Sequence, residues 1–495
     1  MIYIILIGFY MLAMLLVVIF SLGQLNLAVY YLKSRNNRNN SKDVRTLKTF
    51  PFVTVQLPVY NEKYVIERLI DSVTAIDYPS DRIEIQVLDD STDETVEIIT
   101  RKVSEYSKSG LNITHLHRDD RSGFKAGALQ LGLQEARGEY IVIFDADFIP
   151  DPKFLKSTLP AFKNAQIGMV QTRWGHINED FSTFTRLQAF GLNAHFSVEQ
   201  SGRSCAGSCI NFNGTAGIWR KSCIEDAGGW HLDTLSEDLD LSYRAQLKGW
   251  KFKYLEDVVS PAELPVVLSA IKSQQYRWNK GAAETARKNL WNVLRSSLKG
   301  INKAHAVFHL LNSSFIPFLF FAAFMSVPML FIKSDNPQFN VIFNISSIFI
   351  IGFIGIAIFY WVSFRYSHKS GSKFDFIKEF FLYIAFFLGL SMHNTIAVLE
   401  GWMGIKTPFV RTPKFDIQSN ADSISANSYI KQKINWEVIL EGMLLIYFVF
   451  GIGAGIYLHD YGLIPFHILL AMGFAAVFIY SLLPVKFYTH ASPAE

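Results

Sequence analysis

Two aspartates directly follow a short apolar run at residues 140–144. The run reads Tyr-Ile-Val-Ile-Phe and is typical of a buried parallel strand, which would end at Asp145 and Asp147. Because residues two apart on an extended segment face the same side, both carboxylates can meet one ligand. Two hard oxygen donors at this spacing suit Mg²⁺ or Mn²⁺ that also binds a diphosphate. The alternative interpretation is a surface turn, where Asp is common.

A second acidic pair, Asp89 and Asp90, follows an apolar run at 83–88. A carboxylate at a strand end is suited to hydrogen-bond a base or a ribose hydroxyl. The segment 121–127 between the two acidic pairs contains Lys125 and two glycines, which could approach phosphates or could form an ordinary solvated loop. Together the two acidic pairs favour a nucleotide-sugar site.

Polar, glycine-rich segments at 171–175, 202–207 and 212–215 are typical of loops that bind an acceptor. Further on, Glu237 and Asp238 follow Ser236, which we expect to cap a helix. Acids in a first helical turn also match the helix dipole, which is the simpler explanation for them. The functional alternative makes Asp238 a general base that takes a proton from a sugar hydroxyl.

A predicted amphipathic helix carries Gln274, Arg277 and Trp278. The indole of Trp278 offers a flat face for a sugar ring, and the Arg277 guanidinium offers a fork for phosphate. The same aromatic and basic pair could instead anchor the helix to lipid headgroups.

Short apolar runs alternate with helical patterns along the first third of the chain. We expect strands at 52–57, 83–88, 113–117 and 140–144, with helices at 64–74, 94–106 and 126–135 between them. Alternation at crossover lengths predicts an α/β domain with a mostly parallel sheet in a nucleotide-binding style.

Half of the 495 residues are hydrophobic, and the excess is concentrated in five blocks at 2–32, 313–333, 341–364, 438–458 and 463–485. Each block is long enough to cross a hydrocarbon core of about 30 Å, so we expect an integral membrane protein. The first block lacks a basic leader and a small-residue cleavage site, so we expect it to remain as a span.

Basic residues follow the first block at 33–48 and predict an outward N-terminus with residues 33–300 on the cytoplasmic side. The net charge of +4 therefore reflects the membrane, and we expect no nucleic-acid partner. Cys205, Cys209 and Cys223 lack the further ligands that a zinc site needs, so we expect free thiols.

The four motifs in order resemble the processive family 2 glycosyltransferases, which include cellulose, chitin and hyaluronan synthases. The motifs are Asp89-Asp90, Asp145-x-Asp147, Ser236-Glu-Asp238 and Gln274-x-x-Arg277-Trp278; the family usually has Thr where this chain has Ser236. Segments 171–174, 212–219 and 226–280 look closest to cellulose-synthase-like enzymes that make mannan, glucomannan or xyloglucan-type backbones. The resemblance implies a GT-A-type domain embedded in a multi-span α-helical membrane domain.

The resemblance also implies roles for individual residues. In the family the first acidic pair contacts the nucleoside, the second acid of Asp-x-Asp binds the metal, the last acid of the third motif is the base, and the Gln-x-x-Arg-Trp helix borders acceptor and diphosphate. Together with the residue chemistry above, these roles give four sets of residues. The nucleotide-sugar set is Asp89, Asp90, Lys125, Asp145, Gln274 and Arg277, and the metal pair is Asp145 and Asp147. The base is Asp238, and the acceptor set is Phe212, Asn213, Gly214, Thr215, Glu237 and Trp278.

The C-terminal part contains a segment similar to the Phe-x-Val-Thr-x-Lys gating loop of bacterial cellulose synthases. Its residues are Phe409, Thr412 and Lys414, with Arg where the family has Val. We expect residues 374–402 to form an interfacial helix, which leaves loop 403–437 cytoplasmic, although a sixth crossing at 377–402 stays open. The expected organisation is a span at 1–32, a basic linker at 33–49, the catalytic domain at 50–264, interfacial helices at 265–303, two spans within 304–366, the interfacial helix at 374–402, the loop at 403–437 and two spans within 438–485.

These expectations describe a processive inverting membrane glycosyltransferase. It would use UDP-glucose or GDP-mannose with Mg²⁺ or Mn²⁺, extend a polysaccharide acceptor into a β-linked, β-1,4 mannan, glucomannan or glucan, and export it. One alternative is an enzyme that adds a single sugar to a lipid, as ceramide glucosyltransferases do; a second is an inactive scaffold in a synthase complex. We expect the bacterial cell membrane, or the Golgi membrane if the source is eukaryotic. The sugar, the linkage, the oligomeric state and any accessory subunit are open at this point.

Overall fold

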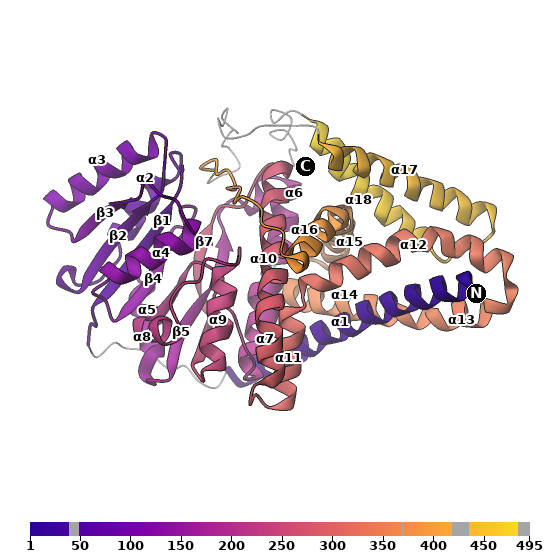
Figure 1. The fold of residues 1–495 in the computed structure, drawn as a ribbon, viewed down its shortest axis with the longest axis horizontal. Helices are drawn as coiled ribbons and strands as arrows, with labels where there is room; N and C mark the ends of the chain where they lie inside the picture. The colour runs from indigo at the N-terminus through magenta and orange to yellow at the C-terminus, as the bar shows by residue number, and fades with distance from the viewer. Residues whose placement is uncertain (39–48, 368–370, 418–434, 484–495) are drawn as a thin grey trace.

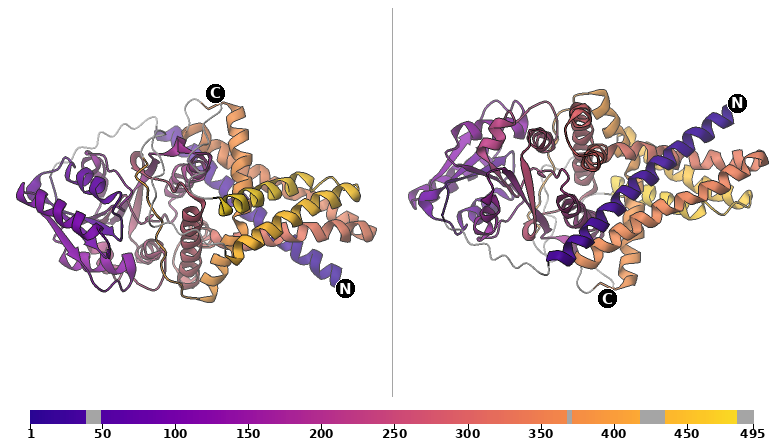
Figure 2. Two further views of the ribbon diagram at one scale, coloured as in Figure 1. Left: turned by 90° about the horizontal axis from the view of Figure 1, so that it is seen from above. Right: turned by 90° about the horizontal axis from the view of Figure 1, so that it is seen from below.

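The computed structural model describes residues 1–38, 49–367, 371–417 and 435–483. A sheet domain lies at one end of the molecule and a bundle of long apolar helices at the other, with helices between them that run across the long axis (Figure 1). Two further views show the same separation (Figure 2).

A seven-stranded sheet of order β3-β2-β1-β4-β6-β5-β7 forms the centre of the domain. All neighbours pair in parallel except β6, which is antiparallel to both β4 and β5. The strands are β1 Val53–Val59, β2 Ile83–Asp89, β3 Ile113–His117, β4 Tyr140–Ile143, β5 Ile167–His176, β6 Gly217–Arg220 and β7 Lys251–Ala262. The expected α/β class with a mostly parallel sheet is confirmed.

Buried aliphatic residues hold the sheet between its helices. The strands β1, β2 and β4 have almost no exposed side chain, because both of their faces are covered, which is why they read as continuous apolar runs. Burial of each Val or Ile side chain stabilises the folded state by about 1.5–3 kcal/mol relative to an exposed side chain. The helices of this domain are α2 Ile66–Thr74, α3 Thr95–Lys108, α4 Phe124–Glu135, α5 Phe154–Thr158, α6 Thr183–Ala194, α7 Gln200–Cys205, α8 Lys221–Asp226 and α9 Glu237–Leu247. Cys205, Cys209 and Cys223 are free, as expected.

Five helical segments are long and apolar enough to cross a membrane, namely Ile2–Arg35, Ser313–Asp335, Pro337–Ser367, Trp436–Tyr457 and Ile464–Leu482. They contain α1 Ile2–Arg38, α12 Ile316–Asp335, α13 Asn340–Ser346, α14 Ile350–Ser367, α17 Trp436–Tyr457 and α18 Ile464–Leu482. The protein is therefore a multi-span membrane protein. The helix α1 continues six residues beyond the expected end of the first span, and residues 39–48 of the expected linker lie outside the described residues.

The segment with the open sixth crossing forms two helices, α15 Lys373–Gly389 and α16 Ser391–Met403, which are bent by 52° relative to one another. Taken together, the two helices are long and apolar enough to form one membrane span. The number of crossings among the described residues is therefore five or six.

The helices α10 Leu268–Arg295 and α11 Gly300–Leu310 lie between the sheet domain and the spans (Figure 1). Near the start of α10, the Lys272 ammonium donates a hydrogen bond of 2.6 Å to Glu441 on α17, and one of 2.8 Å to Ser481 on α18. At the other edge of the domain, Tyr31 of α1 donates a hydrogen bond of 2.8 Å to the carboxylate of Glu256 on β7. The sheet domain is thus attached to α1 through a buried hydrogen bond, and α10 is attached to α17 and α18 through partly buried ones.

Candidate active site

The carboxyl ends of β1, β2 and β4 meet at one edge of the sheet, because these strands are parallel neighbours. The side chains that follow them therefore converge: Tyr60 and Glu62 after β1, Asp89 and Asp90 at β2, and Asp145 with Asp147 after β4. Ligands of open α/β sheets bind at this edge. The acidic motifs from distant parts of the sequence thus share one region.

Each aspartate of the Asp-x-Asp motif contacts a lysine. The Lys125 ammonium lies 2.6 Å from Asp145 Oδ1, and the Lys414 ammonium lies 2.5 Å from Asp147 Oδ2. Burial alone would lower the pKa of Lys125, but the carboxylates of Asp145 and Glu237 outweigh it and raise that pKa. Each carboxylate therefore contacts a positive charge in this structure, and a divalent cation that used the same oxygen atoms would compete with the two ammonium groups.

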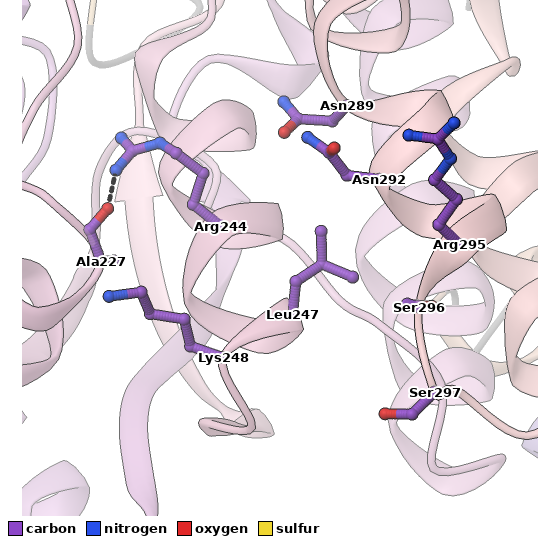
Figure 3. A pocket seen from close by; sticks show the side chains of 9 residues that line it. All are labelled: Ala227, Arg244, Leu247, Lys248, Asn289, Asn292, Arg295, Ser296 and Ser297. Carbon is purple, nitrogen blue, oxygen red and sulfur yellow. Dashed lines mark hydrogen bonds between the residues drawn. The ribbon is translucent and has the colours of Figure 1, made fainter.

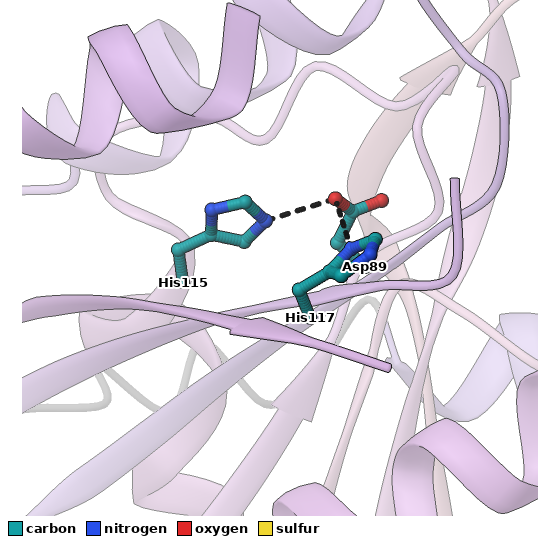
Figure 4. Close-up of side chains that lie close together, drawn as sticks. All are labelled: Asp89, His115 and His117. Atoms are coloured by element: carbon teal, nitrogen blue, oxygen red, sulfur yellow. Dashed lines mark hydrogen bonds and ion pairs between the residues drawn. The ribbon is translucent and has the colours of Figure 1, made fainter. Parts of the chain in front are cut away.

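Asp89 lies beneath the surface, and two histidines of β3 reach it (Figure 4). His115 Nε2 and His117 Nδ1 lie 2.8 and 3.1 Å from Asp89 Oδ2, and the Ser91 amide donates to Oδ1. Burial would raise the pKa of Asp89, but these hydrogen bonds outweigh it and lower that pKa. The Asp89 carboxylate is fully buried, and both of its oxygens accept hydrogen bonds. A nucleoside could contact it directly only if one of the two histidines or the Ser91 amide moved away.

Asp90 forms a two-pronged ion pair with Arg118. The Arg118 Nε and Nη2 atoms lie 2.7 and 2.6 Å from the two carboxylate oxygens. Next to this pair, the Arg121 guanidinium stacks on the Tyr60 ring at 3.3 Å from its centroid. Such a bidentate pair fixes the orientation of both groups.

The predicted acceptor segment 212–215 packs directly against the lysine and the acids. Gly214 has a φ of +82° and its carbonyl accepts a hydrogen bond of 3.0 Å from Lys125. A side chain at this position would begin 3.1 Å from Asp238 Oδ2, so only glycine allows the backbone to come this close. Thr215 is buried, and its hydroxyl accepts a hydrogen bond of 2.9 Å from the Asp145 amide.

Phe212 requires a correction. Its side chain is fully buried and packs edge-on against Trp219 in the core of the sheet domain. It therefore stabilises the fold and does not present a face to an acceptor. Asn213 is the member of this segment whose side chain is partly exposed.

Glu237 and Asp238 begin α9, as expected, and face Lys125 and Gly214. Burial and the neighbouring Glu237 carboxylate raise the pKa of Asp238 to about 7, against the lowering effect of Lys125. Burial raises the pKa of Glu237 as well. Ser236 occupies the N-cap position as expected, and its carbonyl accepts the Asp240 amide, but its side chain makes no capping hydrogen bond. Its hydroxyl packs against Gly281 of α10 instead.

The α10 helix directs Arg277 toward the same centre. Arg277 Nη2 donates a hydrogen bond of 2.6 Å to Thr412 Oγ1, and its guanidinium lies 4.7 Å from the Phe409 ring centroid. Burial lowers the pKa of Arg277 to about 10 although Asp145, Glu237 and Asp147 favour the charged form. Gln274 and Trp278 are partly buried on the same helix.

The segment 409–416 crosses the acidic edge and contacts residues that follow β1, β4 and β7. Phe409 stacks on Phe124, and Arg411 lies 3.5 Å from Glu62. Farther along, the amides of residues 415 and 416 donate to the Glu263 carboxylate at 2.8 and 3.1 Å. The predicted loop thus brings Phe409, Thr412 and Lys414 to the candidate site, while residues 418–434 lie outside the described part of the chain.

Two other clusters among the described residues have ligand atoms close enough to hold a metal ion. They are Asp89 with His115 and His117, and His231 with Asp233 and Asp240. Asp240 already accepts hydrogen bonds from Arg244, Lys288 and Asn289. A pocket of about 390 Å³ lies beside it, lined by Ala227, Arg244, Leu247, Lys248, Asn289, Asn292, Arg295, Ser296 and Ser297 (Figure 3). The pocket contains none of the predicted site residues.

Several site residues escaped the sequence analysis. Tyr60 and Glu62 directly follow a predicted strand, so the rule that selected Asp89 and Asp145 would have found them. Burial raises the pKa of Glu62 to about 8. Arg118 directly follows the predicted strand at 113–117, so the same rule would have found it, and Glu263 directly follows β7, a strand that the sequence analysis did not predict. Arg411 carries no comparable signal, because it lies on an irregular segment far in the sequence from its partner Glu62.

Residues 51–281 match the family described as "Glycosyltransferase like family 2". This part of the chain is therefore similar to family 2 glycosyltransferases. The chain is 37% identical over 332 residues to "Glucomannan 4-beta-mannosyltransferase 1" of Oryza sativa subsp. japonica, covering 64% of this chain and 64% of that relative. "Glucomannan 4-beta-mannosyltransferase 7" of Arabidopsis thaliana is 45% identical over 253 residues, covering 50% of this chain and 46% of the relative. The chain thus spans about half to two thirds of the length of these relatives.

A solved structure shares the fold of a large part of this chain. It is described as "Mannosyltransferase PcManGT from Pyrobaculum calidifontis in complex with GDP-Man and Mn2+", with a TM-score of 0.50 and 20% identity, and it covers 69% of this chain and 98% of its own. The expected family and the expected GT-A-type fold are confirmed by these comparisons.

Proposed function

We propose that this protein is a processive, inverting membrane glycosyltransferase that polymerises GDP-mannose, alone or with UDP-glucose, into a β-1,4-linked mannan or glucomannan and exports it. The observation that carries this proposal is the identity of 37% and 45% to two proteins named glucomannan 4-beta-mannosyltransferases. The shared edge at which Asp145, Asp147, Asp238 and Arg277 meet supports it.

The donor would lie along the carboxyl ends of β1, β2 and β4. In this arrangement Arg118 keeps Asp90 in place, while Lys125 and Arg277 supply the positive charge that a diphosphate needs. GDP-mannose is favoured because the relatives are named mannosyltransferases and the structural neighbour holds GDP-Man. Asp89 would not contact the nucleoside itself. It would hold the His117 side chain in place through their hydrogen bond, and His117 lies at the surface next to the proposed position of the nucleoside.

Asp145 and Asp147 would hold Mg²⁺ or Mn²⁺. The fit rests on their donor chemistry and on their position directly after β4, which places both carboxylates at the edge where the strands end. When bound, the ion supplies positive charge where the leaving diphosphate develops negative charge. The structural neighbour is described with Mn²⁺. Lys414 must leave Asp147 when the ion binds, so the 409–416 segment and the ion would alternate at this carboxylate.

Asp238 is the proposed base. Its raised pKa of about 7 lets the carboxylate accept a proton from the acceptor hydroxyl near neutral pH. The deprotonated hydroxyl oxygen then attacks the anomeric carbon in line with the leaving diphosphate, which inverts the configuration from α to β. Asn213 and Trp278 would position the acceptor sugar, and Glu237 would keep Asp238 basic.

The catalytic domain is proposed to face the cytoplasm, where nucleotide sugars are made, and the spans would carry the polymer out. Basic residues after α1 support this orientation. We keep the bacterial cell membrane as the expected site and the Golgi membrane as the eukaryotic alternative; the plant source of the relatives supports the second.

The test uses purified, detergent-solubilised protein with Mg²⁺ or Mn²⁺ and GDP-mannose, UDP-glucose or both. Products are digested with linkage-specific mannanases and glucanases. We expect a polymer that β-mannanase degrades. A polymer sensitive only to β-glucanase would change the donor assignment, and a monoglycosylated lipid formed from added native lipid extract would overturn the processive function.

A further inference from the structure

A π-helical turn interrupts the helical rod behind the acceptor segment. The helix α6 ends at Ala194, residues His195–Glu199 form the π turn, and α7 follows from Gln200. Such turns cost regular backbone hydrogen bonding and are common at functional sites. This turn places the side chains of His195 and Glu199 against each other.

A chain of hydrogen bonds runs from the π turn to Asn213. Arg203 donates to Glu199 Oε1, and Glu199 Oε2 lies 2.7 Å from His195 Nδ1. On the other side of the ring, His195 Nε2 lies 2.9 Å from the Asn213 amide nitrogen, and Gln200 Nε2 donates to Asn213 Oδ1 at 2.6 Å.

The hydrogen bonds fix the tautomer of a neutral His195. A carboxylate only accepts, so the neutral ring carries its hydrogen on Nδ1 and presents a lone pair on Nε2. That lone pair accepts one N–H of the Asn213 amide, whose oxygen accepts from Gln200. If the amide were flipped, its N–H groups would face the Gln200 donor and its oxygen would face the imidazole lone pair. The orientation of Asn213 is therefore set by His195 and Gln200 together.

Asn213 keeps capacity to bind a ligand. An amide offers two N–H donors and two lone pairs, and the chain uses one of each. The remaining donor and lone pair belong to a partly exposed side chain next to Gly214, whose backbone abuts Asp238 Oδ2. A donor beside an acceptor is the pattern that a sugar hydroxyl needs, since the hydroxyl both donates and accepts.

We propose that His195, held by Glu199, is a positioning residue that orients the Asn213 amide to bind a hydroxyl of the acceptor sugar beside Asp238. This inference rests on the proposed function, because it assigns an acceptor to the same site. Glu199 and Arg203 are both buried, with 6% and 3% of their side-chain surface exposed, whereas 25% of the His195 side chain is exposed. The buried ion pair anchors the chain of hydrogen bonds, and the proposed ligand contact lies at its other end, on Asn213.

The test compares wild type with His195→Ala and His195→Gln in kinetics with GDP-mannose and β-1,4-mannohexaose. Without His195 the Asn213 amide is no longer held in one orientation, so its hydrogen bond to the sugar hydroxyl should weaken. The loss of about one hydrogen bond should raise the KM for mannohexaose about tenfold. The KM for GDP-mannose should stay within about twofold, a split that general loss of folding would not produce. The amide of His195→Gln can still accept from Asn213, so this variant should recover part of the affinity.

The matched control is His393→Ala. His393 also bonds a carboxylate through Nδ1, at 2.9 Å from Glu437, but it lies on α16 away from Asn213. We expect its KM for mannohexaose to equal that of wild type. An unchanged mannohexaose KM in His195→Ala, or an equal rise in both KM values, would overturn the inference.

Equilibrium binding separates this inference from the proposed function. Mannohexaose and GDP are titrated separately against each variant, followed by tryptophan fluorescence, which requires no turnover. Weaker mannohexaose binding by His195→Ala with unchanged GDP binding supports the inference even if no polymer forms. Wild-type protein that makes polymer from GDP-mannose, but binds mannohexaose no more tightly than an Asn213→Ala variant, would refute the inference and leave the proposed function intact.

Discussion

Two groups of acids in the candidate site have different surroundings. On the proposed donor side, Asp90, Asp145 and Asp147 each form an ion pair with one cationic side chain. On the proposed acceptor side, Glu237 and Asp238 lie side by side, and burial raises the pKa of both carboxyl groups. Lys125, which is hydrogen-bonded to Asp145, is the cation that they share.

This difference separates two kinds of chemistry within one site. A carboxylate that is ion-paired is suited to bind cations and to fix groups that carry phosphate. A carboxyl group whose pKa lies near neutrality exchanges protons readily and suits a base. The acceptor-side acids are therefore expected to control the rate of transfer, and the donor-side acids to control cation and nucleotide binding.

The largest effect should follow Asp238→Asn. Removal of the proposed base should lower kcat about a thousandfold, within the range that general base catalysis contributes. Binding of GDP, measured by calorimetry, should be unchanged because the donor-side acids are intact. A variant that keeps more than a tenth of wild-type kcat would rule out Asp238 as the base.

A smaller effect is expected at the donor side with Asp147→Asn. Mn²⁺ affinity, measured by electron paramagnetic resonance of free Mn²⁺, should fall about a hundredfold. Asp151→Asn is the matched control, since Asp151 is an exposed acid four residues away. If both variants bind Mn²⁺ as wild type does, the assignment of the cation to Asp147 fails.

The pH dependence sharpens the acceptor side. Activity requires deprotonated Asp238, so kcat should rise with pH up to about 7 and then level off. The Glu237 carboxylate contributes to that raised pKa, so Glu237→Gln should move the rise to lower pH by about one unit. The relative rate at pH 6 would then increase several-fold. If kcat of Glu237→Gln rises over the same pH range as kcat of the wild type, the coupling between the two acids is contradicted.

The smallest expected effect tests whether Lys414 and the cation compete. In Lys414→Met the ammonium no longer occupies Asp147, so Mn²⁺ should bind about fivefold more tightly. Lys406→Met, on the same stretch of chain, serves as the control. Weaker Mn²⁺ binding in Lys414→Met would mean that the lysine supports the cation rather than excluding it.

The sequence predicted the acidic edge well, because one rule covers it. Parallel strands place the residues after their carboxyl ends together, and apolar runs located β1, β2 and β4 to within two residues. The first turn of α9 was found for a similar reason, since acids at a helix start are a local signal.

The contacts that complete the site could not be predicted, because nothing local encodes them. Lys414 meets Asp147 across 267 positions of sequence, and the loop that carries it has no regular pattern. The polar segment 212–215 looked like a surface loop, but composition does not say which side chain turns inward, and Phe212 does. Ser236 had the right type and place for a cap, yet tertiary packing against Gly281 determined its direction.

One helix joins the chemistry to the bilayer. On α10, Arg277 reaches the loop over the acids, and five residues earlier Lys272 is fastened to Glu441 in a membrane span. At 1.5 Å per residue, these two contacts are only about 7.5 Å apart along the helix axis. For the proposed synthase, each sugar is added at the threshold of the membrane, so the polymer is delivered to its exit as it grows and needs no separate carrier to bring it there.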